Sequence, residues 1–242
     1  GEDYSNPKEA REKIMTLAIN DYQAAATKLG VDIASVRAVA SVESNGKGMF
    51  PDGRPAILFE RHIFYRELLK KRNEEAKQRI VRDNPKAIGN AQAILIANEL
   101  RNVKNELDKL TLQYPTICNS QPGGYVGGVK EYDRLAKAEA IDKECALRSC
   151  SWGAFQVMGF HAEFLGFKDV FEMVEYATTD AGQLDIFIRF IQKNPNLLKA
   201  MKARDWANFA RQYNGPSYEK FQYDVKMASA YKLYNANPTM IA

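Results

Sequence analysis

The sequence lacks long apolar runs and is poor in histidine. No run of about 18 apolar residues occurs in the 242-residue chain, which excludes a helix long enough to span a bilayer. Only two histidines are present, His62 and His161, and they lie far apart in the sequence. The paired spacings of a zinc site are therefore missing, and we expect neither a metal nor another cofactor.

Excess charge of either sign is also scarce. The 34 basic and 30 acidic residues give a net charge of +4, and no polybasic block occurs. Nucleic acid is therefore not an expected partner. A weakly basic surface suits an anionic polymer or a cell-envelope surface, but it also serves simple solubility, so charge does not decide the function.

Cysteines are few and give no unique pairing. Cys118, Cys145 and Cys150 allow one disulfide and one free thiol in an oxidising compartment. Three reduced, buried thiols would be ordinary in the cytosol. The sequence leaves both alternatives open.

Apolar residues recur at helical spacing along most of the chain. With 45% hydrophobic residues the chain can bury a large core, and we expect one domain over residues 1–242. The periodicity predicts helices over residues 8–29, 129–147, 169–177, 180–193, 195–202, 206–214 and 218–234, the last with Tyr218, Phe221, Val225 and Ala228 facing inward. A short apolar run at residues 55–60, flanked by turn residues, predicts one of very few strands.

Glu43 is an acid in an apolar helical stripe. A helix capped by Asp32 and stopped at Gly46 would place Glu43 on the same face as Val36 and Val39. Desolvation there, together with the negative end of the helix dipole, would raise the carboxyl pKa toward neutrality, as a general acid requires. An exposed acid at a frayed helix end is the alternative.

Glu60 follows the predicted strand in the same way. It shares a strand face with Leu58, so this acid also follows an apolar row. A salt bridge to the neighbouring Arg61 or Arg54 explains it as well as a role in chemistry does, and the spacing alone leaves both open.

Residues from Glu67 to Leu112 change to a polar, charged composition with Ile and Leu at helical intervals, broken at Asn84-Pro85. This pattern predicts a solvated helical hairpin, an insertion at about residues 68–115. Its expected buried stripe consists of Ile94, Leu95, Leu100, Leu107 and Leu110.

Three other polar side chains lie where a ligand could approach. Tyr125 is in a glycine-rich loop, which could equally be a linker. Gln156 is the only amide in an apolar run, so it is either tied to the backbone or directed into a polar cleft. Tyr213 ends a helix just before Asn214-Gly215-Pro216, which could form a ligand-facing rim or only a capped terminus.

Three motifs in this order resemble the signature of goose-type lysozymes and lysozyme-like transglycosylases. They are Glu43-Ser44 with Gly46, Gly153-Ala154-Phe155-Gln156, and Ala210-Arg211-Gln212-Tyr213-Asn214-Gly215. The chain is more closely similar to phage-endolysin N-acetylmuramidases, over most of its length except residues 68 to about 115. The segments that carry this resemblance are Leu29-Gly30-Val31-Asp32, Arg37 to Ser44, Asp52-Gly53-Arg54-Pro55, Leu58 to His62, Gly123-Gly124-Tyr125 and Ser151 to Gly159.

The resemblance implies a mainly α, lysozyme-like α+β fold, with helical lobes around a cleft that binds peptidoglycan glycan strands. Glu43 matches the family's catalytic acid and Glu60 its second carboxylate. The implied substrate-binding residues are Gln156, Tyr213, Asn214, Ser151 and Tyr125.

The implied reaction is hydrolysis of the β-1,4 bond between N-acetylmuramic acid and N-acetylglucosamine, and the separation of the two carboxyl groups would decide between inversion and retention. A transglycosylase leaving anhydro-muramic ends is one alternative. Another is a non-catalytic glycan-binding component of a phage or secretion apparatus. We expect a monomer, made in the cytoplasm and delivered to the bacterial periplasm or wall by lysis or secretion machinery. An immunity or delivery partner would bind through residues 68–115.

Overall fold

The computed structural model describes residues 7–44 and 48–240, with side chains from residue 18 onward. The predicted helix stop at Gly46 lies outside the described residues. The described chain forms two compact units. Unit 1 comprises the residues up to Gly48, Phe164–Gly166 and the residues from Tyr176 on, and unit 2 comprises Met49–Glu163 and Phe167–Glu175.

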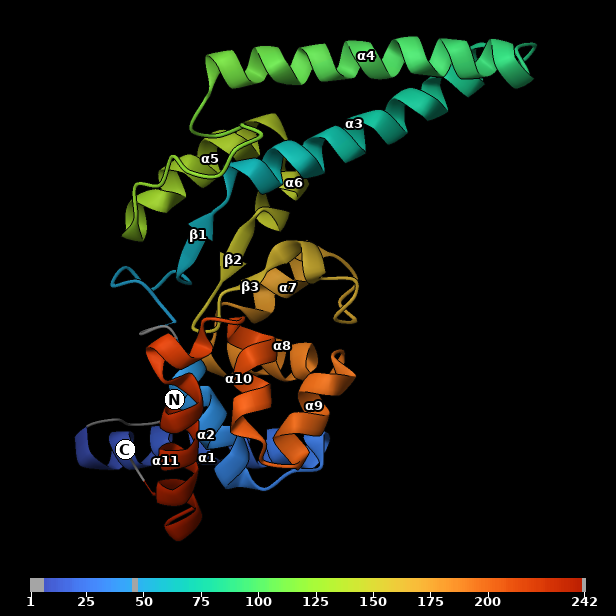
Figure 1. The fold of residues 1–242 in the computed structure, drawn as a ribbon. Coiled ribbons are helices and arrows are strands. Elements are labelled where there is room, and N and C mark those ends of the chain that lie inside the picture. The colour runs from blue at the N-terminus through green and yellow to red at the C-terminus, as the bar shows by residue number, and fades with distance from the viewer. Residues whose placement is uncertain (1–6, 45–47, 241–242) are drawn as a thin grey trace. The chain divides into compact units, whose positions relative to one another are not determined.

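Unit 1 consists of helices (Figure 1). They are α1 (Pro7–Leu29), α2 (Ile33–Glu43), α8 (Asp180–Gln192), α9 (Pro195–Lys202), α10 (Trp206–Asn214), the 3₁₀ helix η3 (Tyr218–Phe221) and α11 (Tyr223–Ala236). Helix α2 packs along α11, and α1 packs against both α2 and α8. These bounds confirm the predicted helices of this part of the chain up to residue 214.

Helix α2 forms as the sequence predicts. The side chain of Asp32 caps it by accepting a hydrogen bond of 2.8 Å from the backbone N–H of Ser35. Val36 and Val39 are buried on its inner face, and Glu43, the last helical residue, is only 8% exposed. The frayed, exposed helix end is therefore the wrong alternative for Glu43.

The C-terminal helix differs from the prediction. Gln222 has a left-handed backbone (φ 56°) and separates η3 from α11, so residues counted through from Tyr218 no longer share one face. Phe221 and Val225, predicted to face inward, are 54% and 55% exposed, and Ala228 is exposed too. The buried residues of α11 are instead Met227 and Tyr234.

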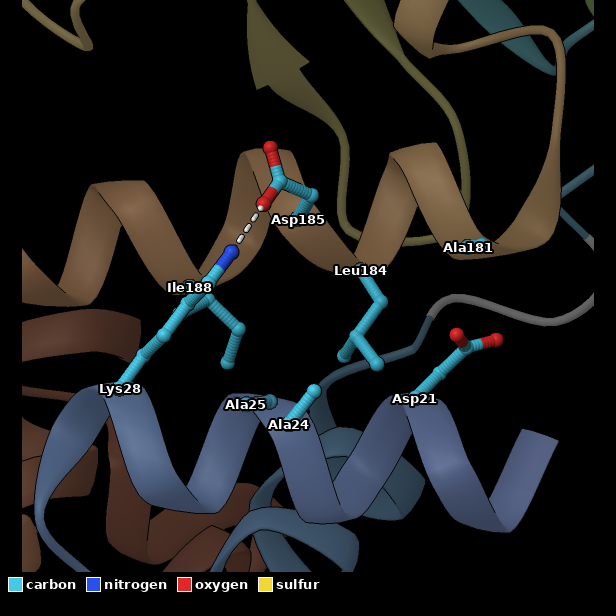
Figure 2. A pocket seen from close by; sticks show the side chains of 8 residues that line it. All are labelled: Asp21, Ala24, Ala25, Lys28, Ala181, Leu184, Asp185 and Ile188. Carbon is cyan, nitrogen blue, oxygen red and sulfur yellow. Dashed lines mark hydrogen bonds and ion pairs between the residues drawn. The ribbon is translucent and has the colours of Figure 1, made fainter. Parts of the chain in front are cut away.

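A small cavity of about 100 Å³ lies between α1 and α8 (Figure 2). The cavity forms because the small side chains of alanines on both helices do not fill the space between them. Lys28 bridges the helices through a contact of 3.2 Å between its Nζ and Oδ1 of Asp185. Burial raises the pKa of Asp21 on the same lining. None of the lining residues belongs to the predicted site.

Unit 2 combines helices with a small sheet (Figure 1). Its elements are β1 (Ile57–Phe59), α3 (Arg61–Asp83), α4 (Gly89–Gln113), η1 (Gly128–Lys130), α5 (Glu131–Ile141), α6 (Lys143–Arg148), β2 (Cys150–Trp152), β3 (Val157–Met158), η2 (Gly159–His161) and α7 (Val170–Tyr176). The expected helix over residues 129–147 is divided at Asp142, whose side chain caps α6 by accepting from the backbone N–H of Cys145 at 2.8 Å.

The sheet is antiparallel, in the order β1-β2-β3. Ile57 pairs with Trp152 and Phe59 with Cys150, while Ser151 pairs with Met158. Only β1 was predicted, because its apolar run is flanked by turn residues, whereas β2 and β3 lie in one apolar run together with the turn between them. The mainly α fold with a small β element is confirmed.

Helices α3 and α4 form the predicted hairpin (Figure 1). Leu107 is fully buried as predicted, while Leu95, Leu100 and Leu110 are half-buried. Ile94 is 61% exposed, and Val103 is buried in its place. Ile94 precedes Val103 by about two and a half helical turns, which places it on the opposite side of α4 from the stripe that packs on α3.

All three cysteines are buried free thiols. Burial raises the pKa of Cys118 to about 11 and that of Cys145 to about 12, so neither side chain is a reactive thiolate at neutral pH. Within residues 7–44 and 48–240, no helix is both long and apolar enough to cross a bilayer.

Candidate functional site

Glu43 is a buried carboxyl group that has one polar partner within residues 7–44 and 48–240. Its Oε2 accepts a hydrogen bond of 2.8 Å from Nδ2 of Asn214, which ends α10. Its Oε1 is buried and has no hydrogen-bond partner among the described residues. Burial raises the pKa of Glu43 to about 7, and the hydrogen bond from Asn214 lowers it by less. This carboxyl can hold a proton at neutral pH and give it up.

Tyr213 precedes Asn214 and is packed among aromatic rings. Its ring stacks on Phe209 at 6.0 Å and meets Phe187 and Phe190 edge-on at 5.6 and 6.0 Å. Burial raises the pKa of its phenol, and so does the nearby charge of Glu43, so the hydroxyl stays protonated. Unit 1 therefore brings three predicted site residues together: Glu43, Tyr213 and Asn214.

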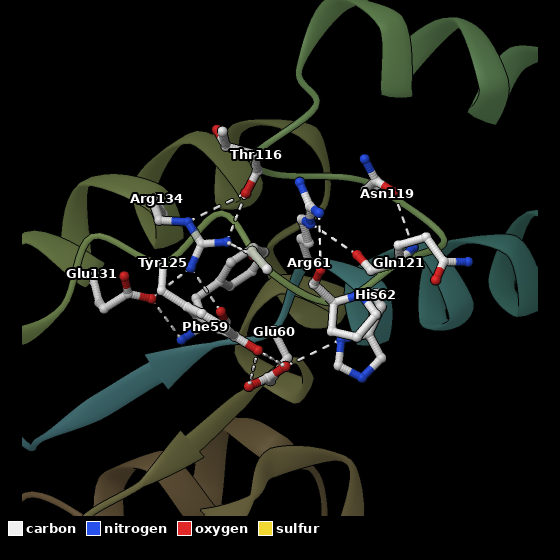
Figure 3. Close-up of polar contacts among 12 residues, drawn as sticks. Phe59, Glu60, Arg61, His62, Thr116, Asn119, Gln121, Tyr125, Glu131 and Arg134 are labelled. Atoms are coloured by element: carbon white, nitrogen blue, oxygen red, sulfur yellow. Dashed lines mark hydrogen bonds and ion pairs between the residues drawn. The ribbon is translucent and has the colours of Figure 1, made fainter.

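Glu60 follows β1 directly and precedes the first residue of α3. The hydroxyl of Tyr125 lies 2.9 Å from its Oε1 and 2.8 Å from its Oε2 (Figure 3). Nδ1 of His62 lies 3.1 Å from Oε2, close enough for an ion pair when the imidazole is protonated, although it lacks the alignment of a hydrogen bond. Unit 2 thus brings Glu60 and Tyr125 together.

The two arginines considered as partners of Glu60 bind elsewhere. Arg54 pairs with Asp52 at 2.7 Å. Arg61 donates to backbone carbonyl groups of the loop that precedes Tyr125 (Figure 3). The neighbours of the Glu60 carboxylate are therefore a phenol and an imidazole, which are both found in sites that handle protons.

Gln156 and Ser151 form a second polar pair in unit 2. Ser151 Oγ donates to Gln156 Oε1 at 2.7 Å. Gln156 Nε2 donates to the carbonyl oxygens of Gly153 and Ala56 at 2.8 and 3.3 Å. Of the two alternatives for Gln156, the structure has the side chain tied to the backbone, where it holds the turn between β2 and β3. Its own backbone is left-handed there, with φ 50°.

Two charged residues of unit 2 complete the surroundings of Glu60. Glu131 and Arg134 are 0% and 4% exposed, and Arg134 Nη1 donates to Glu131 Oε1 at 2.6 Å. Opposite charges three residues apart on a helix are common on solvated surfaces, so no sequence signal marks this pair as buried. Its contacts reach the residue before Glu60 and the loop of Tyr125.

Comparisons with known proteins identify the family of the chain. The family model of the N-acetylmuramidases matches residues 32–235, a range that includes residues of both units. The crystal structure of the Burkholderia AP3 phage endolysin superposes with a TM-score of 0.74 and 41% sequence identity, covering 90% of this chain and 71% of that one. No curated protein matches the chain. With its family model matched over most of its length, the chain belongs to the N-acetylmuramidase family, glycoside hydrolases that cleave peptidoglycan.

Proposed function

We propose that the protein hydrolyses the β-1,4 bond between N-acetylmuramic acid and N-acetylglucosamine, with Glu43 as the general acid. The observation that carries this proposal is the state of Glu43: it is 8% exposed, accepts one hydrogen bond from the residues that the structure describes, and has a pKa of about 7. A proton on Glu43 would pass to the glycosidic oxygen as the bond to the sugar breaks and positive charge develops at C1.

Glu60 is the proposed second carboxylate. The Tyr125 hydroxyl lies 2.9 and 2.8 Å from its two oxygens and can share its single proton between them, and the proposed role uses Glu60 as a carboxylate. In that form it would activate water on the other face of the sugar, or attack C1 itself. The anomeric form of the first product, followed by NMR, separates the two routes, because inversion and retention give opposite anomers.

The proposed substrate-binding residues are Asn214, Tyr213, Gln156 and Ser151, while Tyr125, the fifth residue predicted for this role, contacts Glu60. The carbonyl oxygen Oδ1 of Asn214 is buried without a hydrogen-bond partner among the described residues, so it can accept from a sugar hydroxyl or amide. Gln156 and Ser151 are already bonded to each other, so their contribution would be to hold the β2–β3 turn in shape. Their replacement should raise KM more than it lowers kcat.

Digestion of purified peptidoglycan tests the proposal. The wild-type protein should release reducing fragments, each heavier by one water than an anhydro fragment, and Glu43→Gln should lower the rate roughly 10²–10⁴-fold. Glu219→Gln makes the same chemical change at an exposed position of unit 1 and serves as the control. Exclusively anhydro products would show that the protein is a transglycosylase and not a hydrolase. Lysis by Glu43→Gln at the wild-type rate would refute the assignment of Glu43 as the general acid.

The α3–α4 hairpin is the proposed contact for a delivery or immunity partner. Ile88 and Ile94 on this hairpin are 77% and 61% exposed, and no predicted site residue lies on it. We propose that the protein is made in the cytoplasm and reaches the wall as a monomer through lysis or secretion machinery. Ile88→Asp with Ile94→Asp should leave digestion of purified peptidoglycan unchanged and reduce lysis from within cells. Unchanged lysis would refute the proposed role of the hairpin in delivery.

A further inference from the structure

The loop that carries Tyr125 is fixed by charged side chains that bond to its backbone (Figure 3). Arg61 Nη1, Nε and Nη2 donate to the carbonyl oxygens of Pro115, Gln121 and Pro122 at 2.8, 2.8 and 2.9 Å. Exposed loops seldom have so many of their carbonyl groups bound by one planar guanidinium, whose geometry fixes all three together. The approach to Tyr125 is therefore rigid on its N-terminal side.

Arg134 extends this arrangement to the strand that ends at Glu60. Its Nη2 donates to the carbonyl oxygens of Thr116 and Gly123 at 2.7 and 3.2 Å, and its Nη1 donates to that of Phe59 at 2.8 Å. Phe59 is the residue before Glu60, and Gly123 lies two residues before Tyr125. One guanidinium thus ties the backbone beside Glu60 to the backbone beside its phenol partner.

Glu131 makes the complementary contacts. Its Oε2 accepts from the backbone N–H groups of Val126 and Gly127 at 2.8 and 3.0 Å. Its Oε1 accepts from the backbone N–H of Phe59 at 3.1 Å and from Arg134 Nη1 at 2.6 Å. Both backbone groups of Phe59 are therefore held by the pair, and Tyr125 is held from both sides.

A buried ion pair of this kind is not needed for stability as such. Desolvation of two charges costs about as much as their attraction returns, and apolar replacements of buried pairs are often neutral. The contacts of this pair are specific in another way: they converge on the residue before Glu60 and on the neighbours of Tyr125. We propose that Glu131 and Arg134 are positioning residues that hold the Glu60 carboxylate and the Tyr125 hydroxyl in register.

This inference rests on the proposed role of Glu60. A reacting carboxylate has to be kept within roughly 0.5 Å of its productive position. The Tyr125 hydroxyl, bridging both carboxylate oxygens, fixes the rotation of that group. Tyr125 then serves the second carboxylate and does not primarily bind sugar, so its replacement should affect kcat and not KM.

Tyr125→Phe is the first test, with kcat and KM measured on soluble, uncross-linked glycan strands. The tyrosine is 47% exposed, so loss of its hydroxyl does not threaten folding. We expect kcat to fall roughly tenfold or more, with KM unchanged within twofold. Tyr114→Phe, at a tyrosine 39% exposed whose hydroxyl contacts Gln113, is the matched control. A raised KM with unchanged kcat would overturn the inference and make Tyr125 a sugar contact.

Arg134→Lys and Glu131→Gln test the pair itself, each alone and combined with Tyr125→Phe. A positioning role predicts that each lowers kcat in the wild-type background and has a smaller effect once the hydroxyl is absent, because only the contacts with Phe59 then remain. Losses of melting temperature should simply add, because stability does not run through the Tyr125 hydroxyl. Additive effects on kcat as well would show that the pair is only structural. If Arg134→Lys fails to fold, Glu131→Gln, which keeps one of the two acceptor oxygens and replaces the other by an amide donor, decides the question. If both variants fail to fold, Tyr125→Phe decides it.

Glu60→Gln distinguishes the two possible failures. If this variant keeps wild-type kcat, the proposed function of Glu60 is wrong, and the inference falls with it. If it loses activity while Tyr125→Phe and Glu131→Gln keep wild-type kcat, the second carboxylate stands and only the positioning role is overturned.

Discussion

Replacement of Glu43 by Gln should change how the stability of the protein depends on pH. The carboxyl has a pKa of about 7 in the folded chain against 4.5 for an ordinary glutamate. The folded state therefore binds this proton more tightly than the unfolded state does. The resulting stabilisation is fully present below pH 4.5, declines between pH 4.5 and 7, and is lost above that range.

The size of the effect follows from the shift. One pKa unit corresponds to about 1.4 kcal/mol, so a shift from 4.5 to about 7 corresponds to about 3 kcal/mol. For a chain of 242 residues this equals about 6–12 °C in melting temperature. Because glutamine stays neutral, the wild-type protein should lose that much relative to Glu43→Gln when the pH rises from 4 to 8.

Scanning calorimetry at pH 4, 6 and 8 on both proteins measures this difference. The exposed control Glu219→Gln should follow the wild-type curve at every pH. Parallel curves for the wild-type protein and Glu43→Gln would mean that Glu43 titrates alike in the folded and unfolded states. The reasoning from its burial would then be wrong, even if the variant were inactive.

Three further predictions follow from single features. Hydrolysis by the wild-type protein should fall about tenfold per pH unit above about pH 7, as Glu43 loses its proton, and a rate that stays level to pH 9 would exclude it as the acid. Gly124→Ala should lower the melting temperature more than Gly127→Ala: both glycines have positive φ, +74° and +75°, but only at Gly124 would a Cβ meet neighbouring backbone, at 3.1 Å. Leu107→Ala, at a fully buried hairpin position, should cost about 3–5 kcal/mol of unfolding free energy by denaturant titration, and Leu112→Ala, 85% exposed, under about 0.5 kcal/mol.

Much of the fold could be predicted because helices leave a periodic trace. Glu43 was found from its place in the stripe of Val36 and Val39, and its burial confirms that placement. The hairpin was visible from its composition and its break at Asn84-Pro85, and the helix bounds on either side agree. In these stretches local spacing and tertiary packing require the same residues to be apolar.

The errors occur where one backbone residue or one distant contact decides the outcome. A left-handed Gln222 turns the last helix, and no residue type at that position announces it. Strands β2 and β3 lie in one apolar run without turn residues on both sides of each strand, and they form because β1 pairs with β2 and β2 with β3. The burial of Glu131 and Arg134 depends on a strand about 75 residues away in the sequence. The contact between Glu60 and Tyr125 likewise joins residues 65 positions apart. Such contacts carry no local signal.

Helix α3 starts at the residue after Glu60 and continues for 23 residues without interruption. A helix of that length measures about 35 Å, so the turn between α3 and α4 lies at a defined distance from Glu60, the proposed second carboxylate. A wall-binding module could be inserted at this turn, because the length of the helix would keep the module away from Glu60. The same geometry suits distance measurements. A fluorophore attached to the turn between α3 and α4 would report, by energy transfer, how far a labelled glycan strand lies from Glu60.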